Sequence, residues 1–351
     1  MKKILTTIFV LTSFISFGQD TITANLWKSY MEQKFNYVIE NATTLLQKDP
    51  GNIDLNLMLG RSYSDIGNFK KAIPYLEETV KKDTENTWCK PWALAYLGTC
   101  YFMEQKYDSS KNSLNECINL NILKNPTNYA YGLTLLFGYN TFYDNWKIVE
   151  SDHFRFHFQK MTGADIEKYV LLREQAYNLI NNFFNNSLPK KIDFFVWNSR
   201  DDAKALLKTD LGFAKPTVCV VHSYYQQTIG HEMTHVISEY TSTNLNKTRF
   251  INEGTAVYFD QSDYDKMLLV KEWIKNNNKI IIIKDLWAGQ WGSPDELVYP
   301  VSGLFVKKLV DNFGRDKFNY FFKNQTYENE KLVFGDNLDL VIRAFEKEIN
   351  E

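Results

Sequence analysis

The chain has 351 residues, of which 44% are hydrophobic and 15% aromatic, so it can form cores in about two globular domains. Its formal net charge is −2 and its basic residues form no cluster, which excludes a basic nucleic-acid-binding face. The spacings of Cys89, Cys100, Cys117 and Cys219 match no zinc or redox motif. We expect buried free thiols, with a disulfide among the first three left open.

The N-terminus has the layout of a secretory signal peptide. Lys2 and Lys3 precede an uncharged, largely apolar run from Ile4 to Phe17, and small residues flank Phe17. This run is too short to span a bilayer, and no later apolar run is long enough. We therefore expect residues 1–18 to direct export, and we expect a periplasmic or extracellular protein without a stable membrane span.

Residues 21–125 have the apolar periodicity of helices and contain an internal repeat. The segment GRSYSDIGNFKKAIPYLEETV aligns without gaps with GTCYFMEQKYDSSKNSLNECI, at an offset of 38 residues. The alignment pairs Gly60 with Gly98 and Leu76 with Leu114. The pattern resembles tetratricopeptide repeats, which have a period of about 34 residues. In the second copy, Ser110 replaces the usual Ala. The resemblance implies stacked helical hairpins that either bind a peptide or protein partner or only pack on the next domain.

We predict a break at residues 124–128, which contain Pro126, followed by a linking helix and turn at 129–146. After these segments the helical periodicity gives way to patterns typical of strands. Period-two or apolar runs predict strands at 153–159, 192–197 and 217–221, and a helix is predicted at 164–184. The last strand either presents an edge to an extended peptide or is internal. The remainder is mainly helical. We therefore predict an α+β domain over residues 146–351.

The segment GHEMTHVISEY contains an HExxH motif, with His231 and His235 four residues apart. Residues i and i+4 of a helix differ by about 40° around its axis, so both imidazoles project from one face and can reach one ion. Zinc suits two imidazoles and a carboxylate, with the fourth position left for water. Glu232 follows the first ligand and is placed to take a proton from that water.

A third ligand is needed, and FINEGTAVYFD supplies Glu253. The stretch between His235 and Glu253 is long enough for a turn, a loop and the start of a second helix. Apolar neighbours would bury this second helix and direct Glu253 inward. The alternative metzincin pattern needs Gly at position 238 and His at position 241. The chain has Ser238 and Thr241 there, which excludes that class.

HEMTH followed by Asn252-Glu253-Gly254 resembles the gluzincin metallopeptidases, the thermolysin-like and aminopeptidase-N-like group. The segment YPVSGLFVKKLVDNFG resembles the helix after the site in peptidase MA-like domains. The resemblance covers residues 146 to 345 and implies one Zn²⁺ on His231, His235 and Glu253, with Glu232 as general base. The amine-recognition segment of the aminopeptidases is missing, and Val257 stands where thermolysin-like enzymes have Asp.

Further site residues follow from this reading. Besides zinc, a second group must stabilise the oxyanion of the tetrahedral intermediate. Tyr299 is the preferred candidate for this hydrogen-bond donor, and Tyr224 and Tyr225 are the alternatives. Asn252 or Asp260 would support the ligands. The sequence thus predicts a secreted zinc-dependent peptidase that hydrolyses peptide bonds of a peptide or protein substrate. The alternative is a catalytically silent metal-binding repeat protein that acts as an interaction module.

Overall fold

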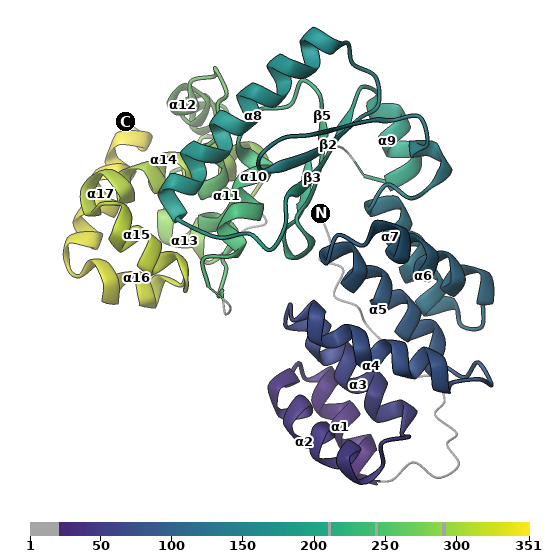
Figure 1. The fold of residues 1–351 in the computed structure, drawn as a ribbon. Coiled ribbons are helices and arrows are strands. Elements are labelled where there is room, and N and C mark those ends of the chain that lie inside the picture. Colours follow the sequence, from purple (N-terminus) through teal and green to yellow (C-terminus); the bar gives the residue numbers. More distant parts are fainter. Residues whose placement is uncertain (1–20, 210–211, 243–244, 290–292) are drawn as a thin grey trace. The chain divides into compact units, whose positions relative to one another are not determined.

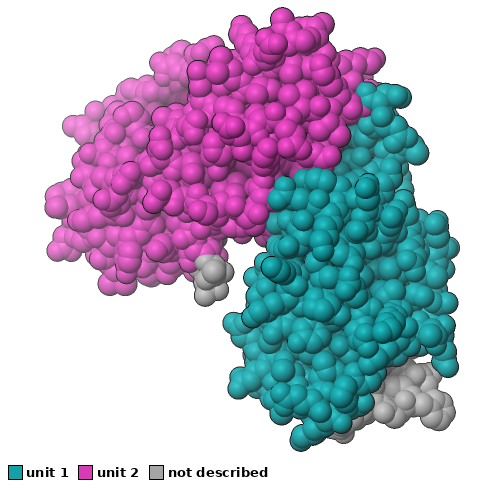
Figure 2. All heavy atoms as spheres, viewed as in Figure 1, with its two compact units in different colours: residues 1–145 teal, residues 146–351 magenta. Residues whose placement is uncertain are grey.

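A computed structural model describes residues 21–351, except 210–211, 243–244 and 290–292 (Figure 1). The predicted signal peptide, residues 1–18, lies outside the described residues. The chain divides into two compact units between residues 145 and 146, which are coloured separately in Figure 2. Among the described residues, no helix is both long and apolar enough to cross a membrane.

The first unit is an array of helical hairpins in which each helix packs against the next. Its elements are α1 (Thr21–Met31), α2 (Phe35–Lys48), α3 (Ile53–Asp65), α4 (Phe69–Lys82), α5 (Cys89–Met103), α6 (Tyr107–Leu120), α7 (Lys124–Leu136) and the short 3₁₀ helix η1 (Thr141–Tyr143). Two apolar clusters run through the array, one centred on α1 to α3 and one on α3 to α5. Stacking of the hairpins therefore buries apolar side chains that a single hairpin would leave exposed to solvent.

The internal repeat has a direct structural counterpart. A Cβ on Gly60 would lie 2.5 Å from the Leu76 side chain, and one on Gly98 would lie 2.3 Å from the Leu114 side chain. Each glycine thus lets two helices of one hairpin approach closely, at equivalent points of the two copies. Ser110, which stands where the repeat pattern usually has Ala, also has a structural role. Its hydroxyl donates a 2.6 Å hydrogen bond to the Gly98 carbonyl.

The predicted break at residues 124–128 is wrong, because α7 begins at Lys124 and continues through it. Pro126 stands in the first turn, where a backbone N–H has no helical partner and proline is tolerated. The array therefore extends through α7. All four cysteines are buried free thiols, as expected.

The second unit begins with a five-stranded sheet of order β1-β2-β3-β5-β4. Its strands are β1 (Lys147–Glu150), β2 (Phe154–Phe158), β3 (Ile192–Trp197), β4 (Phe213–Lys215) and β5 (Val220–Tyr224). The central strands β2, β3 and β5 are parallel, and the edge strands β1 and β4 run antiparallel to their neighbours.

The strand predicted at 217–221 is displaced, and it does not form an edge. Residues Pro216–Val218 form a 3₁₀ turn, η2, and Cys219 has a φ of 52°, which is incompatible with an extended strand. The strand β5 begins only at Val220 and lies between β3 and β4. The short strand β4, which the sequence did not predict, forms the edge on this side of the sheet.

Aromatic side chains cover both faces of the sheet. On one face, α8 (Gly163–Phe184) packs Tyr169 and Tyr177 against phenylalanines of β2 and β3. On the other, rings stack across four strands in the order His157, Phe195, His222, Phe213. The sheet is thus packed by aromatic side chains on both faces and is part of the core.

Helices make up the rest of the second unit. They are α9 (Arg200–Leu207), α10 (His231–Glu239), α11 (Arg249–Tyr258), α12 (Lys266–Asn277), α13 (Ile283–Trp287), α14 (Asp295–Phe313), α15 (Arg315–Phe322), α16 (Tyr327–Phe334) and α17 (Asn337–Asn350). The fold is α+β and mostly helical, with an N-terminal hairpin array before a mixed sheet, which confirms the predicted class.

Candidate metal centre

A glycine fixes the start of the HExxH helix. Gly230 has a φ of 107°, and a Cβ at this position would lie 2.3 Å from the backbone oxygen of Phe259. Only glycine fits both the backbone conformation and this close approach. Helix α10 begins at the next residue, His231, and packs beside β4, β5 and α8. The beginning of α10 is thereby held against the end of α11.

Close packing of two helices positions the second motif. Helix α11 is capped by Thr248, whose hydroxyl accepts a hydrogen bond from the Ile251 amide. A Cβ on Gly254 would lie 2.6 Å from the Ser302 backbone oxygen, and one on Gly303 would lie 2.4 Å from the Val257 side chain. The glycines therefore let α11 and α14 pack almost backbone to backbone. Val257, in the position of the thermolysin-like Asp, serves this packing.

His231, His235 and Glu253 converge on one point and form a group that could hold a metal ion. Glu253 Oε2 lies 3.4 Å from His231 Nε2 and 3.5 Å from His235 Nε2. One candidate ligand atom from each residue lies within 4.8 Å of the others. All three side chains are mostly buried, with exposed fractions of 12%, 13% and 20%.

The distances from Glu253 Oε2 to the two imidazole nitrogens suit three ligands of one zinc ion better than they suit direct hydrogen bonds. Two ligand atoms about 2.1 Å from a tetrahedral ion lie about 3.4 Å apart. A hydrogen bond between a ring nitrogen and a carboxylate is usually shorter, about 2.7–3.2 Å. The donor set of two imidazoles and one carboxylate is also one that zinc accepts. The residues present therefore fit the ion that the motif predicts.

The charges around the group favour an ionised third ligand. Burial opposes ionisation of Glu253, but His231 and His235 outweigh it and hold the pKa of its carboxyl well below the ordinary value. Burial also opposes protonation of His231, yet Glu253, Glu232 and Asp260 together raise the pKa of that imidazole. A cluster this rich in negative charge attracts a cation.

Asn252, one of the two predicted supporting residues, lies beside His235. Its side-chain nitrogen is 3.2 Å from His235 Nδ1, and its buried oxygen Oδ1 has no hydrogen-bond partner among the described residues. Exchanging the amide oxygen and nitrogen by a flip of the side chain lets Oδ1 accept a hydrogen bond from the Nδ1–H group of His235, which gives the oxygen a partner. That tautomer leaves Nε2, the nitrogen facing Glu253, unprotonated and able to bind a metal ion.

Asp260, the other predicted supporting residue, lies near His231, since each shifts the pKa of the other. Burial raises the pKa of the Asp260 carboxyl, and His231 partly offsets this. Its oxygen Oδ1 is buried without a hydrogen bond to any described residue. Asp260 therefore contributes charge to the site and lacks the direct contact that Asn252 makes.

Glu232 and Tyr299 both lie next to the ligands. Glu232 is buried in the first turn of α10 and acts electrostatically on His231 and Tyr299. The Tyr299 ring centroid is 5.8 Å from that of His231. Burial and the nearby carboxylates of Glu253, Asp295 and Glu232 raise the pKa of Tyr299, so its phenol stays protonated.

The rival tyrosines are engaged elsewhere. Tyr224 and Tyr225 contact each other, with ring centroids 4.8 Å apart, and Arg200 lies over Tyr224. Of the three tyrosines that the sequence offered, Tyr299 is the one whose ring contacts a candidate ligand.

One feature near the group was not predicted. Arg249 and Asp295 form an ion pair, and both act electrostatically on Tyr299. Each stands four residues before a predicted site residue, Glu253 or Tyr299, and therefore on the same helix face. This four-residue spacing is the sequence feature from which the two residues could have been assigned to the site.

The sequence matches no protein-family model, and no curated protein is significantly similar to it. The resemblance to gluzincins therefore depends on the motif residues themselves and on the way the fold arranges them.

Proposed function

We propose that this protein is an exported zinc-dependent peptidase. The observation that carries the proposal is the convergence of two α10 imidazoles and one α11 carboxylate, at distances of 3.4 and 3.5 Å that suit a tetrahedral ion. The resemblance of HEMTH and NEG to gluzincins supports the same reading. The N-terminal sequence supports export to the periplasm or outside the cell.

Zinc on His231, His235 and Glu253 would polarise the scissile carbonyl and lower the pKa of a bound water. Glu232 would accept a proton from the attacking water and later deliver it to the leaving amine. Its position directly after the first ligand, in a mostly buried environment, supports this role. Tyr299, kept protonated, would donate a hydrogen bond to the oxyanion that develops on the carbonyl.

The residues around the ligands would keep them in place. Asn252 would fix the His235 ring through Nδ1, and Asp260 would add negative charge beside the neutral, metal-binding His231. The hairpin array would supply a surface for the substrate or for a protein partner, as stacked helical repeats commonly do.

Two measurements test the proposal. The first is zinc content, by elemental analysis of the wild type and of Glu253→Ala, where we expect about one ion per chain and a large loss. The second is cleavage of a peptide library by the wild type and by Glu232→Gln, where we expect cleavage that the variant loses. A wild type that binds zinc but cleaves no peptide would favour the silent interaction module. A wild type without zinc would refute both.

A further inference from the structure

A cavity of about 740 Å³ opens at the carboxyl ends of the three parallel strands. Its lining includes the residues that follow these strands closely, Lys160 after β2, Asn198 after β3 and Tyr225 after β5. The first turns of α8 complete the wall. In open α/β sheets, ligands bind at this end of the strands. Apart from Tyr225, the rival oxyanion donor that lies away from the ligands, none of the predicted metal-site residues lines this cavity.

The wall of the cavity contains a buried arginine, Arg173. Arg173 is only 5% exposed, and its guanidinium lies 3.2 Å above the centre of the Tyr169 ring. Among the described residues, no carboxylate forms an ion pair with it. Burial lowers its pKa, and the interaction with Tyr169 only partly offsets this. Buried charges in proteins are normally paired, so an unpaired buried cation at a cavity wall indicates a missing anion.

The charges around Arg173 have the same sign. Lys160 and Lys168 also line the cavity and are exposed, so three cations stand against one acid, Asp165. The Asp165 carboxylate accepts a hydrogen bond from the Thr162 hydroxyl. Each of the two lysines, like Arg173, lacks an ion pair with the residues described.

The N-terminus of α8 adds to this positive character. Thr162 is its N-cap residue, but the side chain bonds to Asp165 and does not cap a backbone amide. The helix has 22 residues, and its N-terminal amides and dipole favour an anion.

We infer that this cavity binds a small ligand that carries an oxyanion, a carboxylate or a phosphate, on an apolar or aromatic body. The guanidinium of Arg173 matches the planar, two-oxygen geometry of such a group, and the lysines add point charges at the rim. Met161, Leu172 and the rings of Tyr169 and Tyr225 provide the apolar walls for the body. The inference does not depend on the proposed peptidase activity.

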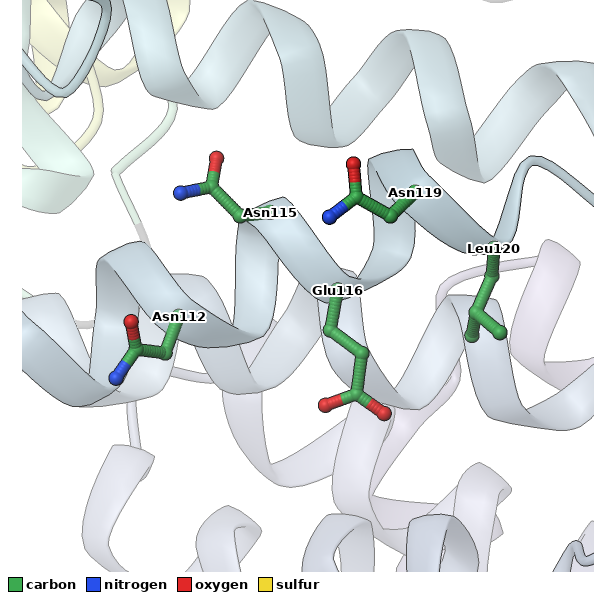
Figure 3. Close-up of a pocket in the computed structure, with 5 residues that line it drawn as sticks. All are labelled: Asn112, Asn115, Glu116, Asn119 and Leu120. Carbon is green, nitrogen blue, oxygen red and sulfur yellow. The ribbon is translucent and has the colours of Figure 1, made fainter.

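A second hollow, of about 430 Å³, lacks these features. It lies along α6 and is lined by one helix alone, as Figure 3 shows. Its residues are Asn112, Asn115, Glu116, Asn119 and Leu120. The four polar side chains are exposed, and the single charge is not buried. Such a surface is solvated as it stands and does not require a ligand.

Calorimetric titration of the full chain tests the inference. The probes are phenyl phosphate, phenylacetate, inorganic phosphate and the neutral benzyl alcohol, at fixed ionic strength. We expect at least one aromatic anion to bind at least about tenfold more tightly than the alcohol, because a hydrogen bond to a charged group contributes more than a neutral one. Comparing phenyl phosphate with phenylacetate identifies the preferred oxyanion, and inorganic phosphate shows how much the aromatic body contributes.

Three variants assign the binding to this cavity. Arg173→Met keeps the apolar stem and should weaken anion binding at least about tenfold. Lys168→Met changes an exposed residue, so it should fold even if Arg173→Met does not, and it should weaken binding and its salt dependence. Arg343→Met, at an exposed position of α17, should leave binding unchanged. The inference fails if no anion binds more tightly than the alcohol, or if Lys168→Met binds the anions as tightly as the wild type does.

Discussion

Replacing Gly254 by alanine should separate the two helices that form the candidate site. The new Cβ would lie 2.6 Å from the Ser302 backbone oxygen, and real Cβ contacts are essentially never shorter than 3.0 Å. Because the contact is with backbone and not with a flexible side chain, helix α11 would have to shift away from α14. Overpacking of this kind costs about 1–3 kcal/mol, while alanine in a helix gains up to about 1 kcal/mol over glycine. We expect a net loss of about 1 kcal/mol, or about 2–4 °C in Tm for a unit of this size.

The matched control is Gly132→Ala in α7, where the new Cβ would have no heavy atom within 4 Å. This variant should gain about 0.5–1 kcal/mol in free energy of unfolding, because alanine lowers the conformational entropy of the unfolded chain and meets no new steric contact. Differential scanning calorimetry of both variants gives the two shifts, and elemental analysis should show weaker zinc retention in Gly254→Ala, since Glu253 is its chain neighbour. If Gly254→Ala melts at or above the wild-type temperature, the close packing of α11 and α14 does not position the site.

Three further predictions concern separate parts of the fold. Glu330 is fully buried, and burial raises the pKa of its carboxyl to about 9, so folding favours the protonated form. Its contribution to stability is present below the unfolded pKa and falls by up to about 1.4 kcal/mol per pH unit as the pH rises toward 9. Glu330→Gln should remove this slope in urea melts between pH 5 and 8, and an unchanged slope would contradict the argument. Asn252→Ala should weaken zinc binding about 10- to 100-fold in competition with a chelator, because it frees the His235 ring, and an unaltered affinity would show that the amide has no such role. Ser110→Ala should cost about 1 kcal/mol in thermal unfolding through the lost hydrogen bond to Gly98, whereas a neutral result would mean that the bond adds no net stability.

Much of the candidate site could be predicted because the positions of its residues depend on short spacings in the sequence. Residues four apart on a helix share a face, so the sequence placed His231 and His235 together without knowledge of the fold. Glu253 was reached by its distance along the chain from His235 and by the apolar residues around it. The sheet was harder to predict, because β1 and β4 are short and are held by pairing with longer strands. The left-handed backbone at Cys219, which displaces β5, leaves no signal in an apolar run.

The sequence alone determined the repeat, the α+β class and the residue types of the metal group, since these follow from helical and strand periodicity over a few residues. Only the tertiary structure decided that the Glu253 carboxylate faces both imidazoles, because that depends on how closely Gly254 and Gly303 let two helices pack. It also decided that Arg173 lies buried near the strand ends, with no ion pair to any residue that the structure describes. Burial and charge pairing are properties of contacts between segments distant in the chain, and no local pattern encodes them.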